Sequence, residues 1–209
     1  MSAFHDCKQV EAESLRQLTP LIERRAFRGR YVTTAKGRLA AELQRKYGDL
    51  LMNRPNGDVC AVEIKAEREE KFGNFFLEEW SNRSRATPGW MRTLDVDWLL
   101  YHFLRDARPG LLPGSNSRST GLLYCIPFPQ LKEWAYVRPS RKRPEVPGRV
   151  HDYELRRQTK YDQLNDTWGY AVNIWEFTSE VRCDLYLRVH GQWIPDIEHA
   201  KRNVERFVG

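Results

Sequence analysis

Three polar residues close together in the chain have the types and spacing needed to hold a metal ion and cut a phosphodiester. Asp49 precedes an apolar run, and Glu63 and Lys65 alternate with apolar residues in the next such run. Side chains two positions apart on a strand share a face, so Glu63 and Lys65 should lie side by side. Neighbouring carboxylates repel each other, and Mg²⁺ relieves this by binding carboxylates, waters and phosphate oxygens. Lys65 would orient the attacking water and stabilise the charge of the transition state.

These residues need a β-hairpin to bring them together, and residues 55–57 (Pro-Asn-Gly) form its turn. A three-residue loop, a type I turn followed by a bulge, places Asp49 opposite Glu63. A two-residue loop over 56–57 would shift the register by one and turn Asp49 to the other face. We favour the first register, because Pro55 suits a turn corner better than a paired strand position.

The pattern of Asp49 followed by Glu63-Ile64-Lys65 resembles the PD-(D/E)XK nuclease superfamily, with Gly48 where proline is often found. The following residues 73–98 are similar to the corresponding part of small phage and prophage nuclease-like proteins. The resemblance implies a restriction-endonuclease-like core, a Mg²⁺ or Mn²⁺ cofactor, and the Ile64 carbonyl as a further metal ligand.

Two more acidic residues are candidates for this site. Residues 74–80 are expected to form the third strand of a meander, and Glu78 then faces the metal if that face is the active one, while Glu79 points away. Glu42, on the helix before the hairpin, could supply another carboxylate, as in similar nucleases. A solvated surface charge is the favoured interpretation of Glu42.

The fold class indicated is α/β: a mixed sheet that starts with an antiparallel meander, flanked by helices. Residues 8–28 have a helical pattern, with Thr19-Pro20 starting a new segment. A second helix, capped by Thr33 or Thr34, runs to Lys46 with a buried stripe of Leu39, Ala40 and Leu43. The length of 209 residues fits a single nuclease-like domain with its core at about 30–135.

The later elements complete this domain. Residues 97–104 and 121–127 are expected to be strands, residues 108–119 a loop, and residues 129–136 a helix packed through Leu131 and Trp134. The region 170–209 should hold a closing hairpin and an amphipathic helix over 197–207. Residues 81–92 form a rim that could face substrate.

Charge indicates the partner. The net charge of +6 and a pI near 9.2 favour nucleic acid over a membrane surface. Basic residues concentrate in the segment 138–160, which could contact phosphates without reading bases. A solvated linker is the alternative for this segment. The residues expected to bind DNA are Arg141, Lys142, Arg143, Arg156, Arg157 and Lys160, and Gln163, Asn165 and Thr167 could face the substrate.

Other chemistries find little support in the sequence. The five histidines show no pair at zinc-ligand spacing, and no Walker loop or nucleophile elbow is present. The four cysteines are widely separated, and Cys60 and Cys125 lie in apolar runs as buried thiols would. A charged N-terminus and the lack of a membrane-length apolar run indicate a cytoplasmic protein in a reducing compartment.

The sequence therefore predicts a metal-dependent nuclease, with DNA favoured over RNA as its substrate. The missing glutamine-tyrosine signature of processive exonucleases favours an endonuclease. Because duplex cleavage by such a site usually needs two active sites, a homodimer is expected. The alternative is a catalytically silent protein with a nuclease-like fold that binds nucleic acid or serves as a phage-derived interaction protein.

Overall fold

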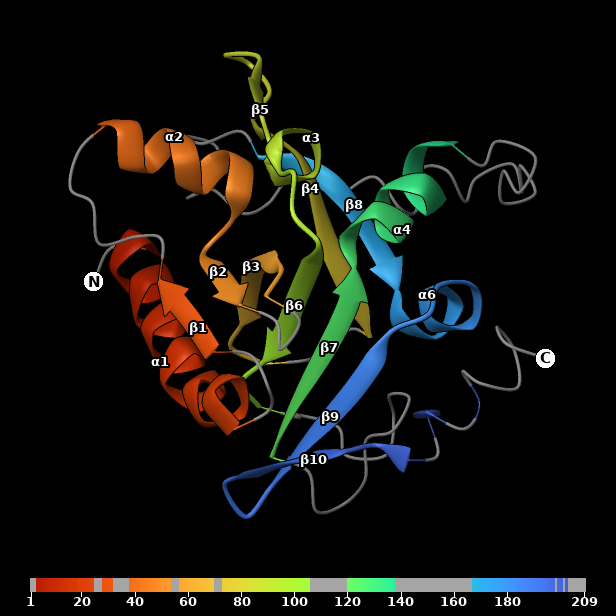
Figure 1. The fold of residues 1–209 in the computed structure, drawn as a ribbon. Helices are drawn as coiled ribbons and strands as arrows, with labels where there is room; N and C mark the ends of the chain where they lie inside the picture. The colour runs from red at the N-terminus through yellow and green to blue at the C-terminus, as the bar shows by residue number, and fades with distance from the viewer. Residues whose placement is uncertain are drawn as a thin grey trace.

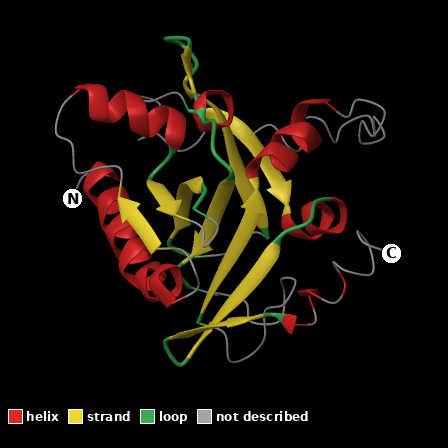
Figure 2. Ribbon diagram, in the orientation of Figure 1, coloured by secondary structure: helices red, strands yellow, loops and turns green. Residues whose placement is uncertain are grey.

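The computed structural model describes residues 3–24, 28–31, 38–53, 57–69, 73–105, 120–137 and 167–197, together with 199, 200 and 202. The chain is mixed α/β, as the sequence predicts (Figure 2). Its helical elements are α1 (Ala3–Arg24), α2 (Arg38–Tyr47), α3 (Trp90–Thr93), α4 (Phe128–Lys132), the π-helix η1 (Glu133–Val137) and α6 (Ile174–Glu180).

Two sheets organise the described part of the chain. The larger has the strand order β1-β2-β3-β6-β7-β9-β10, and only the β3–β6 pair is parallel. Its strands are β1 (Arg28–Tyr31), β2 (Leu50–Asn53), β3 (Val59–Glu67), β6 (Trp98–Phe103), β7 (Gly121–Pro127), β9 (Asp184–Val189) and β10 (Gln192–Pro195). The smaller is antiparallel, in the order β5-β4-β8, with β4 (Asn74–Asn82), β5 (Thr87–Pro88) and β8 (Trp168–Asn173).

Each face of the large sheet has its own hydrophobic core. Helix α1 covers one face and buries Leu18 and Ile22 against Cys60 and Val62 of β3 (Figure 1). The small sheet covers the opposite face, where Phe75 packs on the aromatic side chains of β6 and β7. Strand β3 therefore lies between two apolar layers, which explains why polar groups on it can be deeply buried.

The meander differs from the prediction in one strand. The sequence indicated residues 74–80 as its third strand, but β1 takes that place by pairing with β2, and β4 pairs with β5 and β8. The open edge of β3 is instead occupied by β6, whose six residues are apolar apart from His102. Such a run suits a central, parallel-paired strand buried on both faces, whereas β4 alternates buried and half-buried residues.

Two helix predictions were wrong. Helix α1 continues through Thr19 and Pro20, because burying Leu18 and Ile22 outweighs the roughly 3 kcal/mol that proline costs inside a helix. In α2, Leu43 is 38% exposed where it was expected to be buried, and the side chains of Leu39 and Ala40 lie outside the described residues. This helix lies at the periphery of the molecule (Figure 1), so its side chains from residue 41 to 47 are all exposed.

Several other predictions are confirmed. Residues 98–103 and 121–127 are strands, residues 128–137 are helical with Leu131 fully buried, and β9 and β10 form the late hairpin. The caps at Thr33 or Thr34, the loop 108–119, Gln163, Asn165, most of the helix over 197–207 and the whole basic segment 138–160 lie outside the described residues. Within the described residues, every helix is too short or too polar to cross a bilayer.

Candidate metal-binding active site

The β2–β3 hairpin has the register that a three-residue loop requires. Leu50 pairs with Val62 and Asn53 with Val59, which brings Asp49, just before β2, next to the stretch of β3 that carries Glu63. Residues 54–56 of the turn lie outside the described residues. The pairing nevertheless decides between the two registers considered, and the two-residue loop is excluded.

Asp49 continues the hydrogen bonding between β2 and β3, first with its backbone and then with its side chain. Its backbone N–H donates to the carbonyl of Val62 at 2.9 Å, and its Oδ2 accepts from the backbone N–H of Ile64 at 2.9 Å. Its Oδ1 accepts from Nε2 of Gln44 in α2 at 2.8 Å. Since the N–H and C=O of one strand residue point to the same side, the Ile64 carbonyl faces the edge where this carboxylate lies. The Asp49 carboxylate and the Ile64 carbonyl thus lie on the same side of β3, next to the start of β2.

The backbone conformation of Gly48 excludes the proline that is often found at this position in the nuclease superfamily that the sequence resembles. Its φ is +75°, which proline cannot adopt because its ring holds φ near −65°. A Cβ at this position would also lie 2.6 Å from the Val62 carbonyl oxygen. The turn from α2 into β2 therefore depends on glycine to bring Asp49 against β3.

Gly48→Ala should destabilise the protein by about 2–3 kcal/mol, through left-handed backbone strain and contact with Val62. Gly57→Ala is the matched control, because Gly57 also has a positive φ (+90°) but no atom lies within 4 Å of its added Cβ. We expect Gly57→Ala to cost about 1 kcal/mol, from strain alone. Urea unfolding measures both, and equal losses would contradict the close packing of Gly48 on β3.

Glu63 and Lys65 form an ion pair on the face of β3 opposite Val62. Nζ of Lys65 lies 2.5 Å from Oε1 of Glu63, and Glu63 is only 6% exposed. Burial raises the pKa of Glu63 to about 7; Lys65 opposes this shift, and the negative charge of Asp49 adds to it. The structure therefore brings the three predicted catalytic residues into one electrostatic unit.

Lys65 is partly open to solvent, with 32% of its side chain exposed. Burial lowers its pKa, but the attraction of Glu63, with contributions from Asp49 and Glu78, is stronger and leaves the pKa raised. Its ammonium lies 5.5 Å from the centre of the Trp90 ring. Lys65 is thus held as a partly exposed cation beside Glu63.

Glu78 reaches this unit from the second sheet. Its carboxylate accepts a hydrogen bond from the backbone N–H of Trp90, and burial raises its pKa against the pull of Lys65. Glu79 points the other way, where it pairs with Arg92 at 2.8 Å and accepts from the Tyr136 hydroxyl. The two residues therefore diverge as predicted, and Glu78 lies on the side of Lys65.

The oxygen donors that could hold a divalent cation are the carboxylates of Asp49 and Glu63 and the Ile64 carbonyl. Within the described ranges, no group of three or more His, Cys, Asp or Glu side chains is arranged to bind a metal. Glu78, the further metal residue predicted from the sequence, lies close enough for its charge to act on Lys65. Two carboxylates, a carbonyl and water still fit Mg²⁺, which usually keeps several waters and needs few protein ligands.

No family model, curated protein or solved structure matches the chain. A proposal of function therefore rests on the geometry of the site.

The structure also places the remaining predicted residues. Glu42 is exposed on α2, as the favoured interpretation held, whereas Gln44 two residues later contacts Asp49. Thr167 donates to the Ser81 carbonyl and so supports the small sheet.

Two residues of the site were missed by sequence reasoning. Gln44 could have been found from the helix period, because it lies at the end of α2, one turn before Gly48, whose N–H bonds to its carbonyl. Trp90 belongs to the rim 81–92 that was predicted to face substrate, but no local signal placed it beside Lys65. Its place beside Lys65 results from the return of the chain through β4 and β5, where the N–H of Gly89 bonds to the Glu79 carbonyl.

Proposed function

We propose that this protein is a Mg²⁺- or Mn²⁺-dependent nuclease of PD-(D/E)XK type that hydrolyses DNA phosphodiester bonds, cutting within the chain. The observation that carries the proposal is the grouping of Asp49 and the Glu63–Lys65 ion pair around the backbone of Ile64. An antiparallel meander of β1, β2 and β3 with flanking helices also agrees with a restriction-endonuclease-like core.

Each residue has a distinct role in this proposal. Asp49 and Glu63, with the Ile64 carbonyl, would hold the cation, which supplies Lewis-acid stabilisation of the phosphate charge. Gln44 and the Ile64 N–H fix the Asp49 carboxylate. Lys65 would orient the attacking water and neutralise charge on the phosphate as the bond breaks. Glu78 helps to keep Lys65 protonated.

The proposal also includes the cellular compartment and the oligomeric state of the protein. Among the described residues, Cys60, Cys125 and Cys183 form no disulfide with one another, which supports a reducing compartment such as the cytoplasm. Duplex cleavage would require a homodimer or two sequential cuts, since one site of this kind opens one strand.

Cleavage of plasmid, linear and branched DNA, and of RNA, tests the proposal. We expect the wild type to cut DNA with Mg²⁺ or Mn²⁺ and not with chelator, and Lys65→Ala to reduce the rate about 100- to 1000-fold. Lys8→Ala, at an exposed position on α1, is the control and should keep full activity. Equal cleavage by wild type and Lys65→Ala would refute the site. Binding of DNA with no cleavage under any condition would favour the catalytically silent alternative.

A further inference from the structure

A β-hairpin of arginine-rich sequence projects beside the candidate site. Strands β4 and β5 form it, with the turn over residues 83–86, and it stands out beyond α2 and α3 (Figure 1). The residues from Arg83 to Pro88 are all exposed. Residues 80–92 contain three arginines and no acidic residue. The hairpin therefore presents positive charge away from the body of the protein.

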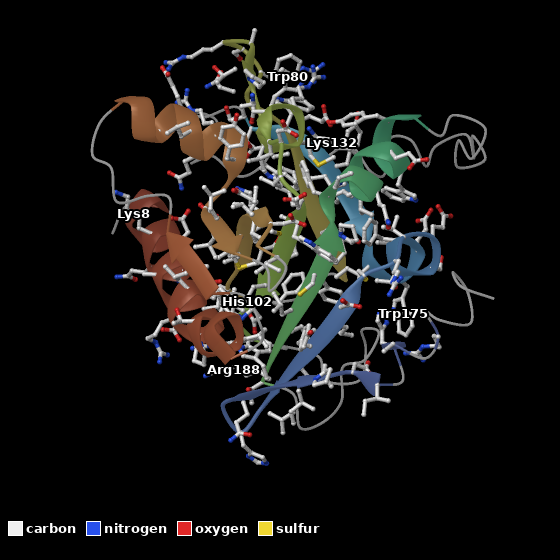
Figure 3. All side chains as sticks on the ribbon, viewed as in Figure 1. Lys8, Trp80, His102, Lys132, Trp175 and Arg188 are labelled. Atoms are coloured by element: carbon white, nitrogen blue, oxygen red, sulfur yellow. The ribbon has the colours of Figure 1, made fainter. Side chains whose placement is uncertain are left out.

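Two tryptophans contact arginines in and beside this hairpin: Trp168 contacts Arg83 of the turn, and Trp80 contacts Arg92 of α3. The Arg83 guanidinium lies 4.3 Å from the centre of the Trp168 ring, and Arg92 lies 4.1 Å from that of Trp80. Trp80 and Trp168 are paired across β4 and β8, and Trp80 lies at the base of the projecting hairpin (Figure 3). A guanidinium stacked on an indole is held in one plane and still presents its N–H edges. Arg83 is thus held in place by its ring contact.

The arginines differ in whether a carboxylate already neutralises their charge. Arg92 is paired with the buried carboxylate of Glu79 at 2.8 Å. Among the described residues, Arg83 and Arg85 have no acidic side chain within ion-pair distance. Two N–H-bearing cations at the tip are therefore placed to meet an anionic partner, while Arg92 helps to fix the base.

One strand connects this tip to the site. Glu78, whose charge acts on Lys65, and Arg83 are separated by five positions along β4 and its turn. The backbone between them spans at most about 16 Å at 3.3 Å per strand residue, and less where the pairing of β4 is irregular beside Trp80. A DNA duplex rises about 3.4 Å per base pair, so this length corresponds to about five base pairs.

We infer that the β4–β5 hairpin is a duplex-binding arm, in which Arg83 and Arg85 contact phosphates within about five base pairs of the bond at Lys65. The position relative to the cut bond rests on the proposed function. Phosphate contact itself needs no cleavage. Such contacts add affinity that falls with salt and is independent of base sequence.

The test is DNA binding by the full-length protein in chelator, measured by fluorescence anisotropy of a labelled 30-base-pair duplex between 50 and 200 mM salt. Loss of two phosphate contacts in the R83A/R85A variant should reduce the slope of log K against log salt by about 2. We expect Kd at 100 mM salt to rise about tenfold or more. The control R105A/R182A removes the same charge from two other exposed positions and should change the slope by less than half as much.

The outcomes separate the arm from the catalytic proposal. If the wild type binds DNA without ever cutting it, and R83A/R85A loses affinity as expected, the arm stands and the nuclease proposal fails. If R83A/R85A and R105A/R182A have the same Kd and salt slope, the arm is wrong even where cleavage is observed. Failure of the wild type to bind duplex DNA would also overturn it.

Discussion

Glu63→Gln should lose metal-dependent cleavage and, in the same variant, become more stable than the wild type at pH 8. Glutamine removes one of two carboxylates proposed to bind the cation, and we expect the rate to fall about 1000-fold or more. The stability gain follows from burial, which raises the pKa of Glu63 to about 7. Glutamine resembles the protonated acid and so avoids burying the charge.

The pH range of this gain follows from the pKa of Glu63, which is 4.5 in the unfolded chain and about 7 in the folded chain. Below pH 4.5, Glu63 is protonated in both folded and unfolded chains and contributes no pH dependence. Between pH 4.5 and 7 the unfolded chain releases the proton first, so the stability of the wild type falls as pH rises, by about 3 kcal/mol in total. Above pH 7 the difference from Glu63→Gln should stay constant.

Urea unfolding of both proteins from pH 4 to 8, with a cleavage assay at pH 8, measures these effects. Glu42→Gln is the control, because Glu42 is an exposed carboxylate on α2. It should keep activity and show the wild-type pH dependence. A Glu63→Gln protein that is less stable than the wild type at pH 8 would contradict the placement of this carboxylate.

A buried histidine should make the protein sensitive to acid. His102 on β6 is fully buried, with Nδ1 2.8 Å from Oγ of Ser14 in α1, and its Nε2 has no hydrogen-bond partner among the described residues. Burial, together with the positive charge of Arg188, lowers its pKa to about 3. The unfolded chain therefore takes up the proton first, and stability falls by about 5 kcal/mol as pH drops from 6.5 to 3.

The His102→Asn variant should be less stable than the wild type at pH 7, because it leaves a cavity, but should lack this acid dependence. His190→Asn is the control, since His190 is exposed and its φ of +49° suits asparagine. Unfolding should be followed from pH 7 to 4. Glu63 acts in the opposite direction above pH 4.5, so the difference between variant and wild type is the informative quantity. Parallel pH profiles for His102→Asn and the wild type would show that His102 is not buried as a neutral group.

The site was predictable from sequence where the information is local. The Pro-Asn-Gly pattern predicted the hairpin register that the pairing of β2 with β3 has, and the period of two along β3 placed Glu63 and Lys65 on one face, where they form an ion pair. The same alternation separated Glu78 from Glu79. These features depend on neighbours within about fifteen residues, and strand geometry alone connects them.

The rest depends on contacts between distant segments. No local pattern predicted that β4 would leave the meander, since its partner β8 lies about ninety residues later. Trp90 meets Lys65 only because β4 and β5 fold back over β3. Pro20 was misinterpreted because its effect is decided by the burial of Leu18 and Ile22 in a core formed with the sheet.

The high pKa of Glu63 is consistent with a site selected for function rather than stability. Burying a carboxylate beside another acid destabilises the fold, and the lysine partner offsets only part of this. Groups of this kind are concentrated at functional sites. A purely structural role would be served better by an apolar pair, which is why the proposed function rests on the Asp49–Glu63–Lys65 unit.

Binding of Mn²⁺ followed by electron paramagnetic resonance tests the metal site most directly, because it needs no substrate. We expect the wild type to bind one ion per chain at the site, and Asp49→Asn to lose this binding while keeping its fold, as judged by circular dichroism. Glu42→Gln should bind as the wild type does. Unchanged Mn²⁺ binding in Asp49→Asn, or no binding by the wild type, would contradict the assignment of Asp49 and Glu63 as metal ligands.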